Sequence, residues 1–79
     1  MKITEAMIDK FYEVSIDIEF GNWSDAANIC VDNGFDVFTL LDIKDHVAEE
    51  GQIQMSYRDL AIISVYAERL RYEKKSSGK

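Results

Sequence analysis

The sequence predicts an all-α protein, a small compact bundle of about four helices. Apolar residues recur at steps of three and four along most of the chain, and the 79 residues include no proline to interrupt a helix. A hydrophobic content of 47% is enough for a folded core, but a chain of this length is too short for two cores. We therefore expect a single helical domain over residues 1–75 and a flexible polar tail over residues 76–79.

The first segment opens at Thr4, which is placed to cap a helix because an acidic residue follows it directly. The apolar spacing then predicts a helix over residues 4–19 that ends at Gly21. Its expected buried side is Met7, Phe11, Val14 and Ile18. The alternating stretch over residues 14–20 also fits a short strand, because β-branched residues favour strands. An α+β fold with a strand at 14–20 is therefore the alternative.

Three more helices follow, and each is opened by a residue that caps helices. Ser24 opens a short second helix that ends at Gly34. Asp36 caps a third segment, whose natural end is Gly51. Ser56 opens the last and longest helix. Capping and stop residues thus divide the chain into four helical segments.

The last helix has a wider apolar surface than one core requires. Its apolar stripe and the residues beside it are Leu60, Ile63, Ala67 and Leu70, then Ile62, Val65, Tyr66 and Tyr72. A surface this wide predicts either a central helix or one that is shared with a second copy of the chain. A structural or regulatory homodimer assembled through this helix is therefore one functional alternative.

The charge of the chain is acidic and unevenly distributed. The net charge is −6 and the isoelectric point is near 4.6. Residues 1–50 hold three basic and twelve acidic residues, which gives −9, whereas residues 51–79 hold six basic and three acidic residues, which gives +3. Direct binding to nucleic acid or to an anionic membrane needs a positive surface, so we expect neither. A basic protein is the partner that this charge permits.

The reactive residues do not form a recognisable catalytic or metal motif. His46 is the only histidine and Cys30 the only cysteine, so the usual zinc ligand set is missing. Acids close to His46 in sequence would allow a general acid–base pair, but a solvated polar face is the preferred interpretation of this stretch. We expect no enzyme activity and no cofactor. One cysteine excludes an internal disulfide, and the chain opens with no signal-peptide pattern, so a cytoplasmic location is expected.

Four acids recur at steps of four in the first segment, namely Glu5, Asp9, Glu13 and Asp17. On a helix each becomes the neighbour of the next, and each like-charge pair costs roughly 0.2 to 0.5 kcal/mol. This row is either a solvated face or a surface for a basic partner. Trp23 at the following helix junction either closes the core, which is the preferred interpretation, or is an exposed aromatic anchor. The expected partner-binding residues are Glu5, Asp9, Glu13, Asp17, Trp23, Asp42, Asp45 and Glu49.

These features predict a protein-binding module that acts as an inhibitor or adaptor of a basic protein or nucleoprotein complex. Small size, acidity and the lack of catalytic motifs are shared with phage-encoded inhibitors of CRISPR and restriction complexes, and a DNA mimic of that type is the most specific version. No motif supports membership of a family. A DNA-binding transcriptional regulator that uses the bases between Arg69 and Lys75 is a third alternative.

Overall fold

The structure is a computed structural model that describes residues 2–49 and 55–77. Over these residues the chain forms four helices and no strand: α1 (Glu5–Glu19), α2 (Trp23–Asp32), α3 (Val37–Ala48) and α4 (Tyr57–Ser77). The all-α prediction is therefore confirmed. The strand alternative at 14–20 is wrong, because the helix that starts at Glu5 continues unbroken to Glu19. The described residues also include no other strand with which this stretch could pair.

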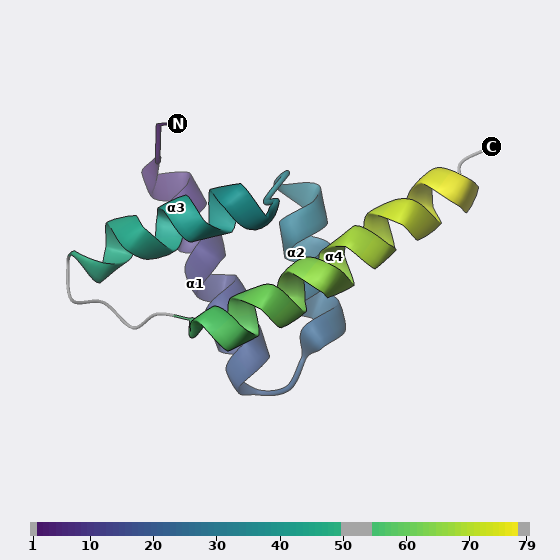
Figure 1. Ribbon diagram of the computed structural model, residues 1–79, viewed down its shortest axis with the longest axis horizontal. Coiled ribbons are helices and arrows are strands. Elements are labelled where there is room, and N and C mark those ends of the chain that lie inside the picture. Colours follow the sequence, from purple (N-terminus) through teal and green to yellow (C-terminus); the bar gives the residue numbers. More distant parts are fainter. Residues whose placement is uncertain (1, 50–54, 78–79) are drawn as a thin grey trace.

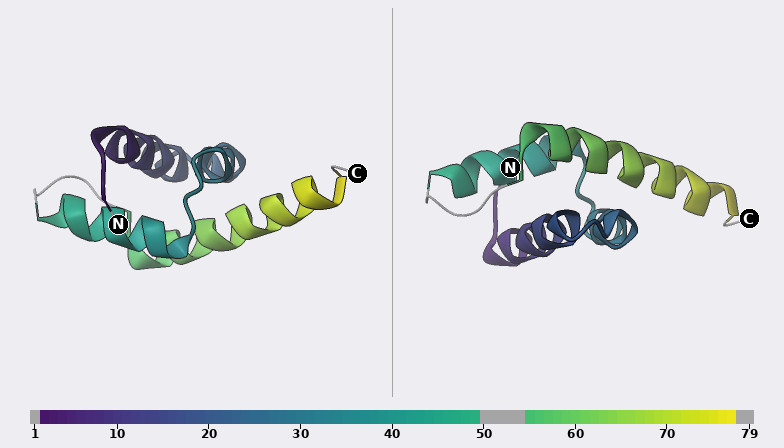
Figure 2. Two further views of the ribbon diagram at one scale, coloured as in Figure 1. Left: turned by 90° about the horizontal axis from the view of Figure 1, so that it is seen from above. Right: turned by 90° about the horizontal axis from the view of Figure 1, so that it is seen from below.

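The helices form two layers. Figure 2 shows α1 and α2 on one side of the molecule, and α3 and α4 on the other. In Figure 1 the α3–α4 layer lies in front, and the C-terminal part of α4 extends beyond the other helices. The molecule measures 43 × 27 × 18 Å along its principal axes. No helix of the described ranges has both the length and the apolar character that crossing a membrane would require.

Predicted capping residues open three of the four helices. The side-chain oxygens of Thr4, Asp36 and Ser56 accept hydrogen bonds from backbone N–H groups three residues further on, at 3.2, 2.8 and 3.1 Å. These bonds satisfy donors that a helix start leaves without a partner. The second helix differs, because it begins at Trp23 with Asn22 at the capping position and has no side-chain capping bond.

The two predicted glycine stops lie where a left-handed backbone is needed. Gly21 and Gly34 have φ values of 78° and 68°, a region that other residues rarely adopt. Gly51, the predicted stop of the third helix, lies outside the described residues. The last helix includes positions 76 and 77, which the sequence assigned to the tail, because serine and lysine residues can continue a helix that is already formed.

The core lies between the two layers. All four helices contribute to it, together with the two connecting residues Phe35 and Met55. Its buried hydrophobic residues are Phe11, Val14, Ile18, Ala26, Ala27, Cys30, Phe35, Leu40, Ile43, Val47, Met55, Leu60, Ile63 and Ala67. The predicted buried stripe of the first helix is confirmed at three of its four positions, and the fourth, Met7, is half-buried.

Two basic side chains tie α3 to α4 at opposite ends. The buried Lys44 donates from Nζ to the backbone oxygen of Met55 at 2.6 Å and lies 4.4 Å from the ring centre of Tyr57. Arg71 donates from Nη2 to the backbone oxygen of Phe35 at 2.7 Å. Because the end of one helix meets the start of the other in both contacts, α3 and α4 lie side by side and antiparallel (Figure 1).

Candidate functional site

The acidic row lies on the outer face of α1. Phe11, Val14 and Ile18 turn one side of this helix into the core. The four acids of the row occupy the opposite side, since positions four apart share a side and this side is offset from the buried positions. Glu5, Asp9 and Glu13 are exposed, and Asp17 is half-buried. With a rise of about 1.5 Å per residue, the row is ~18 Å long and its charges are ~6 Å apart.

One ion pair partly neutralises the row. The Nζ atom of Lys10 lies 3.2 Å from Oε2 of Glu13, three residues further along the same helix. Both side chains are about half exposed, so solvent screens the pair and it contributes little to stability. The outer face of α1 therefore keeps a net negative charge.

Two apolar side chains share this outer face. Ile16 is 52% exposed and Phe20 is 75% exposed. They follow Glu13 by three and seven residues, so they lie on the same side of the helix as the row. Neither residue was among the predicted partner-binding residues, although their spacing from Glu13 in the sequence already places them on the side of the acidic row. We use the term α1 face for the row together with Ile16 and Phe20.

The predicted acids of α3 lie elsewhere. Asp42, Asp45 and Glu49 are exposed on the side of α3 that is opposite Ile43 and Val47, which are buried. Since α1 and α3 belong to different layers with the core between them, the two groups of acids face away from each other (Figure 2). The structure therefore does not join the predicted partner-binding acids into one surface.

Trp23 lies at the edge between α2 and α4. Its ring stacks on the ring of Tyr66, with 5.7 Å between the ring centres and 13° between their planes. The indole is half-buried and packs against the core, whereas Tyr66 remains 44% exposed. Trp23 thus attaches α2 to α4, and its exposed neighbour is the part of this pair that a partner would meet first.

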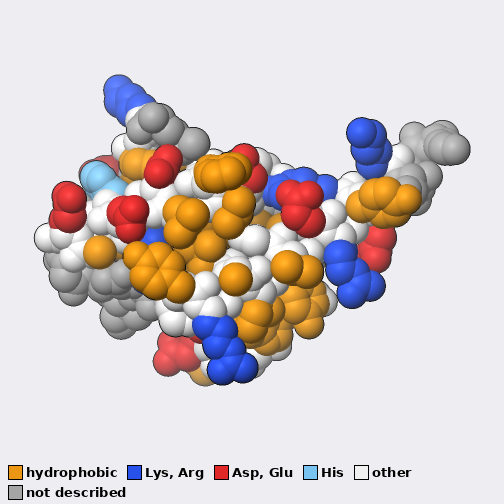
Figure 3. Space-filling view, in the orientation of Figure 1, with side chains coloured by type: hydrophobic (Ala, Val, Ile, Leu, Met, Phe, Trp, Pro, Cys, Tyr) orange, Lys and Arg blue, Asp and Glu red, His pale blue; other side chains and the backbone are white. Residues whose placement is uncertain are grey.

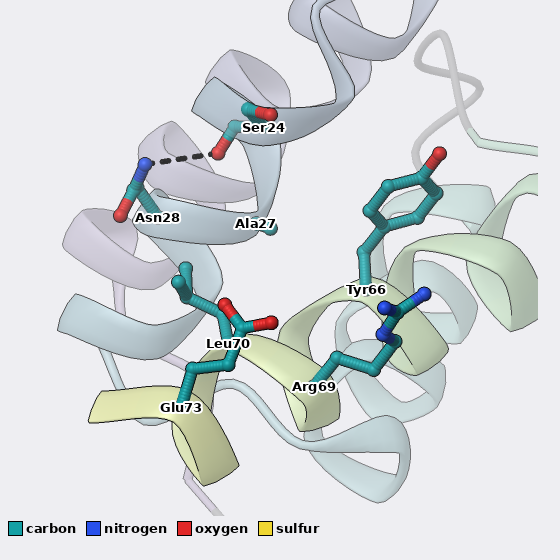
Figure 4. Close-up of a pocket in the computed structure, with 7 residues that line it drawn as sticks. All are labelled: Ser24, Ala27, Asn28, Tyr66, Arg69, Leu70 and Glu73. Atoms are coloured by element: carbon teal, nitrogen blue, oxygen red, sulfur yellow. Dashed lines mark hydrogen bonds between the residues drawn. The ribbon is translucent and has the colours of Figure 1, made fainter. Parts of the chain in front are cut away.

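Beside this aromatic pair is a hollow of about 350 Å³ between α2 and α4. Figure 4 shows its lining, with the side chains of one wall coming from α2 and those of the other from α4. The lining residues are Ser24, Ala27, Asn28, Tyr66, Arg69, Leu70 and Glu73. Only Ala27 among them is buried, and the Asn28 amide already donates to the Ser24 carbonyl at 3.0 Å. The hollow is therefore an open surface depression.

Cys30, the single cysteine of the chain, is poorly placed for nucleophilic chemistry. Cys30 is fully buried in α2, and burial raises the pKa of its thiol to about 11, with a smaller opposing effect from the charge of Arg71. The thiol is therefore neutral near pH 7, whereas the thiolate is the reactive form. Within residues 2–49 and 55–77, no three His, Cys, Asp or Glu side chains are grouped so that they could hold a metal ion.

Comparison of the chain with protein-family models, with curated proteins and with solved structures gives no match. The evidence for a function therefore comes from the exposed faces and the hollow of this molecule alone.

Proposed function

We propose that this protein is a protein-binding module that docks the α1 face on a basic groove of a protein or nucleoprotein complex and acts as its inhibitor or adaptor. The observation that carries the proposal is the composition of this face. Four carboxylates in line and two exposed apolar side chains occupy the outer side of one helix. Within the described residues, the Glu13–Lys10 pair is the only ion pair that these carboxylates form.

The row is a cost to the isolated protein. Its three like-charge steps destabilise α1 by roughly 0.2 to 0.5 kcal/mol each. A partner that is rich in lysine or arginine would convert this repulsion into attraction and would also speed the encounter, since complementary potentials steer association. Acids that served only solubility would be equally effective if they were scattered over the surface.

The exposed apolar residues supply the part of binding that charge does not. Rim charges affect the association rate and specificity more than affinity, whereas aromatic side chains that become buried dominate binding energy. Phe20 lies at the end of the row, where a partner that follows the carboxylates along α1 would cover it. A basic groove with an apolar pocket at one end is the complementary surface.

The line of charges also suggests what such a groove would otherwise hold. A row ~18 Å long with charges ~6 Å apart is a short rigid polyanion. A nucleic acid presents closely spaced negative charges in the same way, so a groove that binds its backbone would also attract the α1 face. The specific form of the proposal is therefore a DNA mimic of the type that phages use against CRISPR or restriction complexes. The proposal includes a cytoplasmic location for the protein. Its one cysteine, Cys30, is a free buried thiol, and thiols stay reduced in the cytoplasm.

The test is affinity capture from the native cell extract with three forms of the tagged protein. The first is the wild type, and the second carries amides in place of the row, as Glu5→Gln, Asp9→Asn, Glu13→Gln and Asp17→Asn. The third is a control with the same charge change at Asp25→Asn, Asp42→Asn, Asp45→Asn and Glu49→Gln. We expect a basic protein or nucleoprotein complex to be retained by the wild type and the control and lost by the row variant. Equal retention by all three forms would contradict the proposal, and loss from the control alone would move the site to the acids of α2 and α3.

A second comparison tests the aromatic anchor. Phe20 and Phe38 are 75% and 73% exposed, so their substitution by alanine removes similar exposed surface from opposite layers. We expect Phe20→Ala to weaken binding of the captured partner by about tenfold or more, in the range of a buried interface aromatic. Phe38→Ala should leave this affinity unchanged. The reverse pattern would place the partner on the α3–α4 layer.

A further inference from the structure

The outer face of the α3–α4 layer is apolar. Phe38, Tyr57 and Val65 are 73%, 63% and 61% exposed, and Val37 and Ala61 are exposed beside them. Figure 3 shows hydrophobic side chains gathered over the two helices on this side of the molecule. We use the term α3–α4 face for Val37, Phe38, Tyr57, Ala61 and Val65.

On α4 this surface is a regular stripe rather than scattered side chains. Ala61 and Val65 are four residues apart and Tyr72 follows seven residues later, a spacing that keeps them on one side of a helix. Leu60, Ile63 and Ala67 are buried on the other side. Of the apolar residues beside the buried stripe, Ile62 is half-buried, whereas Tyr66 is 44% exposed and stacks on Trp23. A helix with apolar residues on both sides is typical of one that is shared between two packed units.

Charges of opposite sign border the two edges of this surface. Asp42, Asp45 and Glu49 lie along the outer edge on α3, and Arg58 and Arg69 lie along the outer edge on α4. Figure 3 shows acidic side chains on the α3 side of the apolar patch, whereas the α4 side has basic side chains together with some acidic ones. None of these five residues forms an ion pair with another residue of the described ranges, whereas the neighbouring Glu68 is paired with Arg71 at 2.9 Å.

We infer that the α3–α4 face binds a second copy of this chain, with α3 of each copy against α4 of the other. Two copies can meet on this face through a two-fold axis that runs either along the helices or across them. An axis across them would place α3 on α3, with acids facing acids. An axis along them places Asp42 and Asp45 of each copy opposite Arg58 of the other, because Lys44 lies beside Tyr57 at this end of the helix pair. Charge complementarity therefore selects one arrangement, and it is isologous, as two-fold interfaces are.

The bipolar border also argues against other occupants. A basic segment would be repelled by Arg58 and Arg69, and an acidic segment would be repelled by Asp42 and Asp45. A second copy is complementary to both edges at once, and it covers the apolar stripe between them. The α1 face lies in the other layer, so a dimer of this kind carries two α1 faces on its outer sides and could engage a partner twice. The inference does not depend on what the α1 face binds.

The test is the molar mass of the full chain by light scattering and sedimentation, with two charge-reversed forms. We expect the wild type to be a dimer at millimolar concentration and to dissociate on dilution. R58E/R69E and D42K/D45K should each be monomeric, because each creates like charges across the interface. Mixed together they should form a heterodimer, since Glu on one copy then meets Lys on the other and the remaining edges keep their native pairs.

Control variants reverse charges on α1, in the other layer. K10E and D9K/E13K should remain dimeric, and circular dichroism should show all four variants to be as helical as the wild type. A wild type that stays monomeric at millimolar concentration would overturn the inference. So would charge-reversed variants that dimerise as the wild type does, or a mixture of them that fails to associate.

Discussion

The two outer faces of this molecule differ in chemistry although they cover the same core. The α1 face has carboxylates in line, with Ile16 and Phe20 as its only strongly exposed large apolar residues. The α3–α4 face is apolar, and charges of opposite sign that form no ion pair within the described residues lie along its two edges. A net charge of −6 therefore does not describe one acidic surface. One outer face is strongly negative, and the other has charges of both signs along its edges.

This difference shows why the acids of the chain have to be divided before a function is argued. Among the described residues, the acids of the row form one ion pair, between Glu13 and Lys10 of the same helix, so an external partner is the natural source of compensation. Those of α3 share a surface with two arginines from α4, so a second copy can compensate them. The following variants compare the free energy of unfolding after substitutions on the inner and outer sides of the helices, and then after substitutions in the two layers.

The largest expected effect separates the two sides of α1. Phe11 is fully buried and Phe20 is 75% exposed on the opposite side. Phe11→Ala should lower the free energy of unfolding by about 3 to 5 kcal/mol, because it removes a core ring and leaves a cavity. Phe20→Ala should change it by less than ~0.5 kcal/mol. Urea denaturation measures both, and effects of similar size would show that the helix is not oriented as described.

The next largest effect concerns the packing of α3 against α4. Lys44→Ala should cost about 1 to 3 kcal/mol, because the buried carbonyl of Met55 loses its donor and the Tyr57 ring loses the ammonium beside it. Lys74→Ala is the control, since that lysine is half exposed and lies 3.6 Å from Asp32, so its ion pair is worth little. Equal stability of both variants in denaturant titration would contradict the buried role of Lys44.

A smaller effect is expected at Asp36, where the chain enters the α3–α4 layer. Asp36→Ala should cost about 1 kcal/mol, because the N–H of Thr39 loses its acceptor, and Asp36→Asn should cost less since asparagine also caps helices. The hydrogen bond from this N–H lowers the pKa of the Asp36 carboxyl below its ordinary value. Because the pKa of Asp36 is lower in the folded state than in the unfolded state, the ionised carboxylate stabilises the fold at a pH above the unfolded-state pKa. This stabilisation is lost as the pH falls through the lowered pKa of the folded state. The stability difference between wild type and Asp36→Asn should therefore narrow in acid, and a difference independent of pH would contradict the cap.

The smallest effect should have the opposite sign. Replacing the four acids of the row by amides should stabilise the monomer by at most on the order of 1 kcal/mol, because three like-charge steps are removed while the Lys10–Glu13 pair is lost. Salt should reduce the gain, since it screens the repulsion in the wild type. Thermal unfolding at low and high ionic strength measures this change. A destabilised variant would mean that the row supports the fold and is not held in reserve for a partner.

Local patterns predicted most of the fold. Helix number, three capping residues, the glycine stops at Gly21 and Gly34 and most of the core follow from spacing within each segment, because caps and amphipathic sides are set by near neighbours. The burial of Lys44 could not be predicted this way. It depends on a carbonyl eleven residues away in sequence, which reaches the lysine only when α3 and α4 are packed.

The surfaces were less predictable for the same reason. The acidic row and the surplus apolar surface of the last helix were visible in the sequence. Which layer each helix joins is a property of tertiary packing. The sequence therefore could not show that the acids of α1 and α3 face apart, or that Asp45 and Arg58 border the same apolar surface.

The central claim is that the acids of α1 are available to a basic partner while those of α3 are compensated within a dimer. The most direct test is to titrate the isotope-labelled chain with a lysine oligomer at dimer-forming concentration and to follow the backbone amide chemical shifts by NMR. The account predicts salt-sensitive shifts along the outer side of α1, centred on Asp9, Glu13 and Asp17, with α3 unaffected. Equal or larger shifts at Asp42 and Asp45 would contradict it.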